Sequence, residues 1–453
     1  MRRLAGLSVL LLGALLGAGA PAPVAAQEVT FGQPAAQATL GEPIVFRTTL
    51  QASGEPAAVE LLISAPGERS VNVLPAELTP AADGWAASAE FEGHAPPNTR
   101  FEYRFRARGA DGHVTLGPSA QAVVSDPRFE WRTIEGGVVR LHWYSGDEAF
   151  ARRALQIGED AVATASGLLG VEESEPIDFL IYDSEAAMRE ALGPGARENV
   201  GGQAHADIRT LFGLIEPSEI NSDWVDTLVV HELTHLVFDT ATDNAYHAPP
   251  RWLNEGVAVY LSEGYTTGWR AAVESAVADG SVIPLDGLGG LFPTTALEFR
   301  LAYAESVAAV DFFIDTYGEP TLWALVRSYA QGVSDDEAFT AATGADLAAF
   351  NAAWMESLGL DVPQPLGPRA GPAGPLPPGW DTPVGTPRPG PTPGPDAPPD
   401  APPTVVPADP PGRPTPDAEP PAGDSLLLGL GIGLAVVAGV VVLALLARRR
   451  LLT

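Results

Sequence analysis

His231-Glu232-Leu233-Thr234-His235 is the stretch that decides the fold of this 453-residue chain. Residues four apart lie on one face of an α-helix, so both imidazoles can reach a single metal ion. Imidazole nitrogens bind Zn²⁺ at about 2.0–2.1 Å, and the spacing therefore predicts a zinc site formed by His231 and His235. Glu232 lies beside them, where its carboxylate can accept a proton from a water molecule on the metal.

A catalytic zinc site needs a third protein ligand and keeps a fourth position open for water. Glu255 lies in the apolar segment 252–260, which Pro249 and Pro250 precede. Proline is common at the start of a helix, so this segment is predicted to be a second helix. A carboxylate among Trp, Leu, Val and Tyr is costly to bury unless it is paired or bound to a metal. Glu255 is therefore the predicted third ligand, and a solvent-exposed helical Glu is the alternative interpretation.

Three other carboxylates near the motif compete for that position: Asp239, Asp243 and Glu263. Asp239 lies one helical turn beyond His235, so its reach back to the metal would be strained. Asp243 falls in a Thr-Asp-Asn stretch that is typical of helix termination, and Glu263 is expected to be solvated near a helix end.

The two motifs, His-Glu-Leu-Thr-His and Trp-Leu-Asn-Glu-Gly, together resemble the gluzincin metallopeptidases, and more narrowly the bacterial peptidase MA-like group. The resemblance covers roughly residues 128–360 and implies a zincin-like domain that hydrolyses peptide bonds in a peptide or protein substrate. It implies three zinc ligands and one general base, namely His231, His235, Glu255 and Glu232.

Two departures from the family's patterns matter. Thermolysin-like gluzincins orient the first histidine with an Asp four residues after the ligand Glu, but this chain has Val259 there, so His231 needs another partner. The GxMEN motif of M1-type aminopeptidases is absent near residues 201–206, so an endopeptidase is expected rather than an aminopeptidase. Tyr303 resembles the tyrosine that stabilises the oxyanion in some gluzincins, and core packing is the alternative interpretation of this residue.

The N-terminal segment 1–26 has the pattern of a signal peptide. Arg2 and Arg3 precede an apolar run from Leu4 to Ala18, and small residues at 24–26 provide a cleavage site. An uncleaved membrane anchor is the alternative.

A second apolar segment lies near the C-terminus. Residues 426–447 carry no charge, and these 22 residues would span about 33 Å as a helix at ~1.5 Å per residue. Arg448–Arg450 follow at once, and the positive-inside rule places the tail 448–453 in the cytoplasm. We therefore expect one transmembrane helix at 425–447 with the catalytic domain extracytoplasmic. A sorting signal cleaved during surface attachment is an alternative, although no LPxTG-type sequence precedes the segment.

Composition adds three constraints. Residues 361–424 hold 24 of the 44 prolines, which predicts a disordered, extended stalk. The formal net charge of −31 argues against nucleic acid and anionic membranes as partners. The chain has no cysteine, which excludes disulfides and thiol catalysis.

Residues 27–127 are predicted to form an all-β, immunoglobulin-like sandwich. Four runs alternate as half-buried strands do: 43–48, 58–63, 85–91 and 100–107. Asp111-Gly112 is a hairpin-turn signal after the last of them. Such runs with turn residues between them are typical of sandwiches. The domain would act as a spacer by default, with substrate docking and partner binding as alternatives.

Residues 128–360 are predicted to form an α+β catalytic domain, in which a small sheet lies over the zinc helix beside a helical lobe. The expected strands are 138–144, 177–182 and 208–215, and the expected helices are 147–169, one from 184, 297–317, 320–329 and 345–358. Ser222 is a candidate cap of the zinc helix. The strand at 208–215 is the predicted edge for an extended substrate. His205, near that strand, is a candidate substrate or oxyanion contact, or simply a surface histidine.

These features favour a membrane-anchored, cell-surface zinc peptidase. The alternative is a non-catalytic surface-binding or envelope-scaffold protein that retained a peptidase-like fold. The complete ligand set with its base, Glu232, argues against a scaffold, because a scaffold has no need of a general base.

Overall fold

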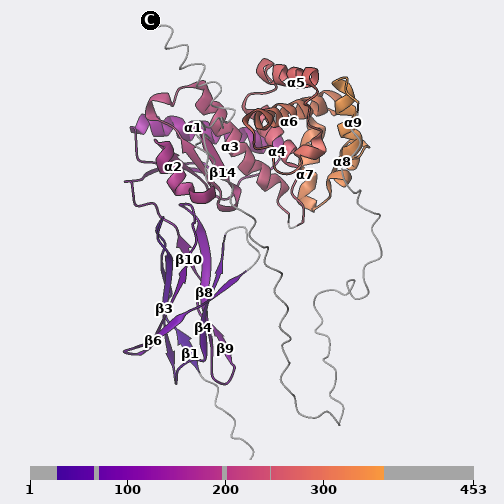
Figure 1. Ribbon diagram of the computed structural model, residues 1–453. Helices are drawn as coiled ribbons and strands as arrows, with labels where there is room; N and C mark the ends of the chain where they lie inside the picture. The colour runs from indigo at the N-terminus through magenta and orange to yellow at the C-terminus, as the bar shows by residue number, and fades with distance from the viewer. Residues whose placement is uncertain (1–27, 66–70, 196–200, 245, 362–453) are drawn as a thin grey trace, which may run out of the picture. The chain divides into compact units, whose positions relative to one another are not determined.

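The computed structural model describes residues 28–361 except 66–70, 196–200 and 245 (Figure 1). These described residues belong to one compact unit. The predicted signal peptide, transmembrane helix and cytoplasmic tail lie outside them, as does the predicted stalk apart from Asp361. Within the described part of the chain, no helix combines the length and apolarity that a membrane span requires.

The described residues of the N-terminal part form strands and no helix. The strands are β1 (Val29–Phe31), β2 (Ala35–Gln37), β3 (Ile44–Ala52), β4 (Ala58–Ser64), β5 (Asn72–Pro75), β6 (Glu77–Ala81), β7 (Gly84–Phe91), β8 (Arg100–Arg108), β9 (Val114–Leu116) and β10 (Ala120–Val123). One antiparallel sheet has the order β1-β3-β7-β6, with β2 also paired to β3. The other has the order β10-β8-β4-β5, with β9 also paired to β8. Their inner faces share one core that includes Phe46, Leu61 and Phe105. The β-rich N-terminal region is confirmed.

Local sequence pattern explains these strands. In β8 the buried residues Phe101, Tyr103 and Phe105 alternate with charged residues that face outward. The predicted turn after β8 is present, since the amide of Gly112 donates to the carbonyl of Gly109 at 2.9 Å. The four predicted runs correspond to β3, β4, β7 and β8. The immunoglobulin-like classification stays a prediction.

A third sheet organises the second part of the chain. It contains β11 (Arg132–Gly136), β12 (Val139–Trp143), β13 (Ile177–Tyr182), β14 (Gly202–His205) and β15 (Thr210–Leu214), in the order β11-β12-β13-β15-β14. The three central strands run parallel, and the two edge strands are antiparallel to their neighbours. All six residues of β13 are buried, as expected for a central strand covered on both faces.

Helices cover both faces of this sheet. On one face α1 (Glu148–Leu169) and α3 (Asp223–Thr242) share a core with strand residues such as Leu141 and Phe179. On the other face α2 (Glu185–Leu192) packs on Tyr182 and Phe212. Asp147 caps α1 by accepting from the amide of Phe150, and the helix ends at left-handed Gly170. Ser222 occupies the N-cap position of α3, but its side chain makes no capping hydrogen bond.

The predicted edge strand at 208–215 is wrong in position. Strand β15 starts at Thr210 and lies between β13 and β14, so both of its edges are paired. The chain reverses through a 3-10 turn at Ala206–Ile208, and Arg209 adopts a left-handed conformation with φ of 49°. This reversal lets the preceding segment pair with β15 and become the edge of the sheet, β14.

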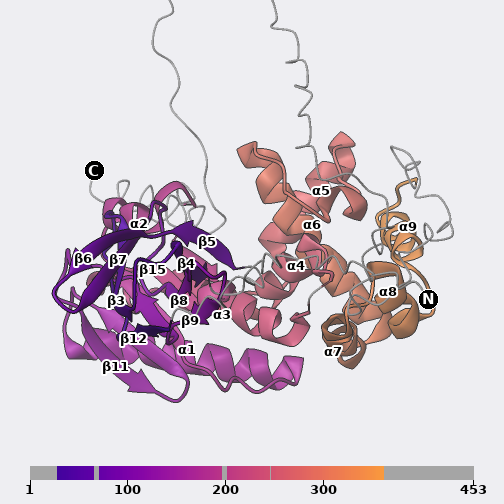
Figure 2. The ribbon, with the colours of Figure 1, turned by 90° about the horizontal axis from the view of Figure 1, so that it is seen from below.

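The remaining helices form a lobe next to α3 (Figure 2). They are α4 (Arg251–Ser262), α5 (Thr267–Asp279), α6 (Ala296–Tyr317), α7 (Glu319–Ser328), α8 (Asp335–Thr343) and α9 (Leu347–Ser357). Helix α4 packs closely on α6 because Gly256 has no side chain. A Cβ atom at this position would lie 2.5 Å from the carbonyl oxygen of Ser306. The position of α4 therefore depends on a glycine, as close backbone approach usually does.

A buried carboxylate joins the sandwich to the third sheet. Asp178 of β13 accepts hydrogen bonds from Asn98 and Arg100 of the sandwich, each at 2.8 Å. Arg140 and His142 of β12 lie on the same carboxylate at 2.7 and 2.8 Å. Burial alone would raise its pKa, but these neighbours hold the pKa of Asp178 well below its usual range. The charged group thus links the two parts of the chain.

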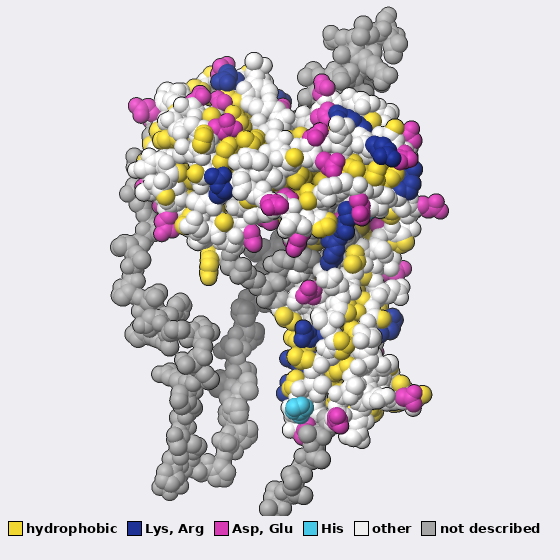
Figure 3. All heavy atoms as spheres, turned by 180° about the vertical axis from the view of Figure 1, so that it is seen from behind, with side chains coloured by type: hydrophobic (Ala, Val, Ile, Leu, Met, Phe, Trp, Pro, Cys, Tyr) yellow, Lys and Arg dark blue, Asp and Glu magenta, His cyan; other side chains and the backbone are white. Residues whose placement is uncertain are grey.

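One face of the molecule shows how its surface charges are distributed. On the face in Figure 3, acidic side chains are spread among arginines, and the described residues of that face form no continuous basic patch. A continuous basic patch is the surface feature by which proteins bind the phosphate backbone of nucleic acids.

The helical lobe contains a buried carboxyl group that forms no salt bridge among the described residues. The side chain of Glu305 on α6 is fully buried, and its Oε1 accepts from the amide of Ile283 at 3.0 Å. Its Oε2 has no hydrogen-bond partner among the described residues. Burial raises the pKa of Glu305 to about 8, although the bond from Ile283 opposes the shift.

We expect Glu305→Gln to change how stability depends on pH. The folded protein keeps the proton up to about pH 8, whereas the unfolded chain loses it near 4.5. The folded state therefore binds more protons between these values, and wild-type stability falls as pH rises through this window. The fall is at most about 1.4 kcal/mol per pH unit. Denaturant unfolding of the purified protein from pH 5 to 8 should show a smaller slope for Glu305→Gln. Glu356→Gln, at an exposed carboxylate on α9, should keep the wild-type slope. An unchanged slope in Glu305→Gln would contradict the raised pKa of Glu305.

Candidate metal centre

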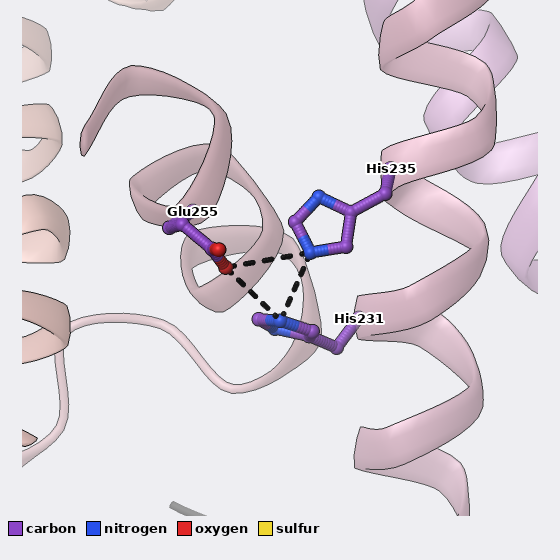
Figure 4. Close-up of side chains that lie close together, drawn as sticks. All are labelled: His231, His235 and Glu255. Carbon is purple, nitrogen blue, oxygen red and sulfur yellow. Dashed lines mark hydrogen bonds and ion pairs between the residues drawn. The ribbon is translucent and has the colours of Figure 1, made fainter. Parts of the chain in front are cut away.

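Two helices bring His231, His235 and Glu255 together. The histidines lie one turn apart on α3, and Glu255 reaches toward both of them from α4 (Figure 4). The two Nε2 atoms are 3.2 Å apart. Oε2 of Glu255 lies 3.6 Å from Nε2 of His231 and 3.4 Å from Nε2 of His235. Within the described part of the chain, these residues form a group able to hold a metal ion.

The geometry of this group fits a tetrahedral zinc ion. Atoms bound at about 2.0–2.1 Å to one tetrahedral ion lie roughly 3.3–3.4 Å from each other. The three separations lie close to this value. Oε2 of Glu255 is also buried without a hydrogen-bond partner among the described residues. A buried carboxylate oxygen in that state is costly unless a cation or donor meets it. Two imidazoles with one carboxylate are a donor set of catalytic zinc sites.

The pKa values of His235 and Glu255 reflect the same convergence. Burial disfavours protonation of His235, but the neighbouring Glu255 carboxylate outweighs it and raises the pKa of His235 to about 9. Burial likewise works against the charged form of Glu255, yet His235 and His231 hold its pKa well below the usual range. The Glu255 carboxylate therefore stays negatively charged beside the two imidazoles.

Asn254 orients one of the imidazoles. Its Oδ1 lies 2.7 Å from Nδ1 of His235. An amide oxygen can only accept, so Nδ1–H donates and the Nε2 lone pair of neutral His235 points toward Glu255. For His231, no described residue hydrogen-bonds to Nδ1. Val259, at the position where thermolysin-like gluzincins carry an Asp, lines a cavity together with His231, His235, Glu255 and Glu232. The partner that the sequence left open for His231 is not found among the described residues.

Glu232 lies in the same cavity but is held by the sheet edge. Its Oε2 accepts from the amide of Ala204 on β14 at 2.9 Å. Gly202 faces the same side chain, and a Cβ there would lie 3.2 Å from Cγ of Glu232. The cavity contains both the metal-binding group and Glu232, with β14 forming part of its wall.

The other residues singled out in the sequence fall in different places. Tyr303 lies within α6, lines the cavity, and packs against Phe292 and Phe299, so its placement fits both interpretations. His205 is not among the residues of the cavity wall, and its ring packs edge-on against Phe212 at 5.3 Å.

The competing carboxylates are separated from the metal-binding group. Asp239 and Glu263 lie on the cavity wall, and Asp243 ends α3, but none of them joins His231 and His235.

Sequence reasoning missed three groups at this site: Asn254, Arg251 and the amide of Ala204. The four-residue spacing of Arg251 and Glu255 was a usable signal, because such residues share a helix face. The contact of Ala204 had no sequence signal, since it depends on how β14 crosses α3.

Residues 157–359 match the model of the Peptidase MA superfamily, which is less than half of the chain and includes the whole metal-binding group. No curated protein matches the sequence. This match supports a gluzincin-like peptidase fold for the part of the chain that carries the site.

Solved structures are similar only at low identity. The M1 zinc metallopeptidase from Deinococcus radiodurans is 13% identical, with 76% of this chain and 95% of that chain covered and a TM-score of 0.31. An aminopeptidase N family protein from Idiomarina loihiensis is 10% identical, with coverages of 74% and 72% and a TM-score of 0.27. CopC from Methylosinus trichosporium OB3b is 14% identical, covers 22% of this chain and 97% of its own length, and has a TM-score of 0.17. At these TM-scores the likenesses carry no conclusion about activity.

Removing a side chain of the metal-binding group should abolish stoichiometric metal binding. We expect His231→Ala, His235→Ala and Glu255→Ala to lose zinc by orders of magnitude in affinity, because two remaining ligands do not hold a catalytic ion. Asp239→Ala, Asp243→Ala and Glu263→Ala are matched controls and should stay within about tenfold. Elemental analysis and chelator competition measure both sets. Zinc loss in Asp243→Ala with zinc retained in Glu255→Ala would contradict the assignment.

Proposed function

We propose that this protein is a zinc-dependent peptidase, with zinc bound by His231, His235 and Glu255. The observation that carries the proposal is the convergence of two Nε2 atoms and a buried, unpartnered carboxylate oxygen at separations that fit one zinc ion. The Peptidase MA superfamily match over residues 157–359 supports the reaction class.

The residues of the cavity divide the chemistry among them. When bound, zinc would supply a Lewis acid that polarises the scissile carbonyl and activates water. Glu232 would accept a proton from the attacking water and pass it to the leaving amine, as a general base and then a general acid. Asn254 would keep His235 in the tautomer that can ligate. Tyr303, on the cavity wall, is a candidate donor to the developing oxyanion.

Strand β14 is the proposed binding edge for an extended substrate. The amide of Leu214 on β15 donates to the carbonyl of Gly201. In an antiparallel pair, alternate residues of a strand hydrogen-bond to the neighbouring strand, so the backbone groups of Gly202 and Ala204 point away from β15. Ala204 accordingly donates to Glu232. A peptide that pairs with this edge would accept from Ala204 through its own carbonyl and release Glu232 for proton transfer. Binding of an extended peptide backbone favours endopeptidase action.

Replacing the base should separate metal binding from turnover. We expect Glu232→Gln to keep one zinc per chain and to lower kcat on a peptide library by about 10²–10⁴-fold, because an amide cannot accept the water proton. Asp239→Asn, which alters another carboxylate of the cavity wall, is the control and should retain activity. Wild-type protein that binds zinc stoichiometrically and cleaves nothing in the library would favour the scaffold alternative. Near wild-type activity in Glu232→Gln would remove Glu232 from the mechanism.

We further propose that the catalytic domain is displayed outside the cell on a membrane anchor. The support lies in the sequence: the signal-like segment 1–26, the proline-rich segment 361–424, and the apolar segment 426–447 followed by Arg448–Arg450. Protease added to intact cells should release a fragment that extends from about Gln27 into residues 361–424. A fragment that appears only after cell lysis would invert the orientation.

A further inference from the structure

Arg251 is the first residue of α4 and lies four residues before Glu255. Its Nε and Nη2 donate to Oε1 of Glu255 at 3.2 and 3.1 Å. The two side chains are 21% and 8% exposed, so the pair lies largely out of water. Charge-assisted bonds between such groups are stronger than neutral ones and fix the carboxylate plane.

The two oxygens of Glu255 therefore have different partners. Oε1 is bound by Arg251, whereas Oε2 has no hydrogen bond among the described residues and faces Nε2 of His231 and His235. A carboxylate without such a neighbour could offer both oxygens to a metal or turn about its last torsion. Arg251 removes both freedoms.

Arg251 is itself held in place. Its guanidinium carbon lies 4.6 Å from the centre of the Phe292 ring, a cation–π arrangement. The Phe292 ring packs edge-on against Tyr303 at 5.5 Å between centroids. The amide of Arg251 also donates to the carbonyl of Gly289 at 2.9 Å. The Arg251 side chain thus binds Glu255 on one side and packs on the Phe292 ring on the other.

The charge of the cavity lining explains why Arg251 pairs with Glu255. Four carboxylates line the cavity, those of Glu232, Asp239, Glu255 and Glu263, and Arg251 is the one lysine or arginine among the described lining residues. Glu255 is the most buried of the four. A buried carboxylate needs a cation beside it, and Arg251 meets this need without occupying the oxygen that faces the histidines.

We infer that Arg251 is a positioning residue that reserves Oε2 of Glu255 for the metal and makes Glu255 a one-oxygen ligand. The inference rests on the proposed zinc site. It adds a residue outside the ligand set that decides how the third ligand binds.

The test compares Arg251→Met, which keeps an apolar stem but no donors, with Arg251→Lys, which keeps the charge without the two-pronged geometry. Arg270→Met is the matched control. Arg270 also stacks on an aromatic ring, Tyr265 at 4.1 Å, and lies 3.9 Å from the Asp311 carboxylate, but it does not line the cavity. Zinc affinity by chelator competition and X-ray absorption of the zinc-loaded full-length protein are measured for each.

We expect zinc affinity to fall about 10–100-fold in Arg251→Met, less in Arg251→Lys, and less than about twofold in Arg270→Met. The absorption spectrum should show one carboxylate oxygen at the metal in wild type and a second, longer carboxylate contact in Arg251→Met. Thermal unfolding of the metal-free variants identifies any loss of fold, and if Arg251→Met does not fold, Arg251→Lys carries the same comparison.

The possible failures are distinguishable. Wild-type protein without stoichiometric zinc overturns the proposed function, and this inference with it. Equal zinc affinity and an unchanged metal environment in both Arg251 variants overturn the inference and leave the zinc site standing. A raised KM with unchanged zinc binding also overturns it, because Arg251 would then serve the substrate rather than Glu255.

Discussion

Burial of the Glu255 carboxylate is the constraint on which the rest of the site depends. Glu255 is 6% exposed. An ionised carboxylate at such a buried position is tolerated only when charged or hydrogen-bonding groups contact its oxygens. Arg251 occupies one oxygen and the two imidazoles of α3 face the other. Because these partners come from two helices, α3 and α4 must meet at a fixed distance and rotation.

Two glycines leave room for Glu255 and Glu232 at this site. Gly256, next to Glu255, lets α4 approach the backbone of α6 at Ser306, and Gly202 leaves room for Glu232 beneath β14. A side chain at position 256 would displace helix α4, which carries Glu255, and a side chain at position 202 would displace the Glu232 carboxylate. The site is therefore positioned by backbone contacts as much as by its own side chains.

Much of the fold follows from patterns that the sequence shows. Period-two alternation predicted four strands of the sandwich, β3, β4, β7 and β8, whereas the shorter strands were not predicted. The apolar residues of α1, α6, α7 and α9 predicted these helices within a few residues. Two helices were missed, α5 and α8, which begin after the N-cap residues Thr266 and Ser334. The edge of the sheet was predicted at the wrong strand. A 3-10 turn and the left-handed residue Arg209 divide residues 202–214 into two strands, and the first of them, β14, forms the edge.

The sequence by itself determined which residues can ligate and which can take a proton, because four-residue spacing on a helix is a local property. It favoured Glu255 because a carboxylate in an apolar segment needs a partner. Only the tertiary structure decided what surrounds these groups: Asn254 behind His235, Arg251 on Oε1 of Glu255, and the β14 amide on Glu232. These contacts depend on the distance and rotation between α3, α4 and the sheet edge, which are set by packing across residues far apart in the chain.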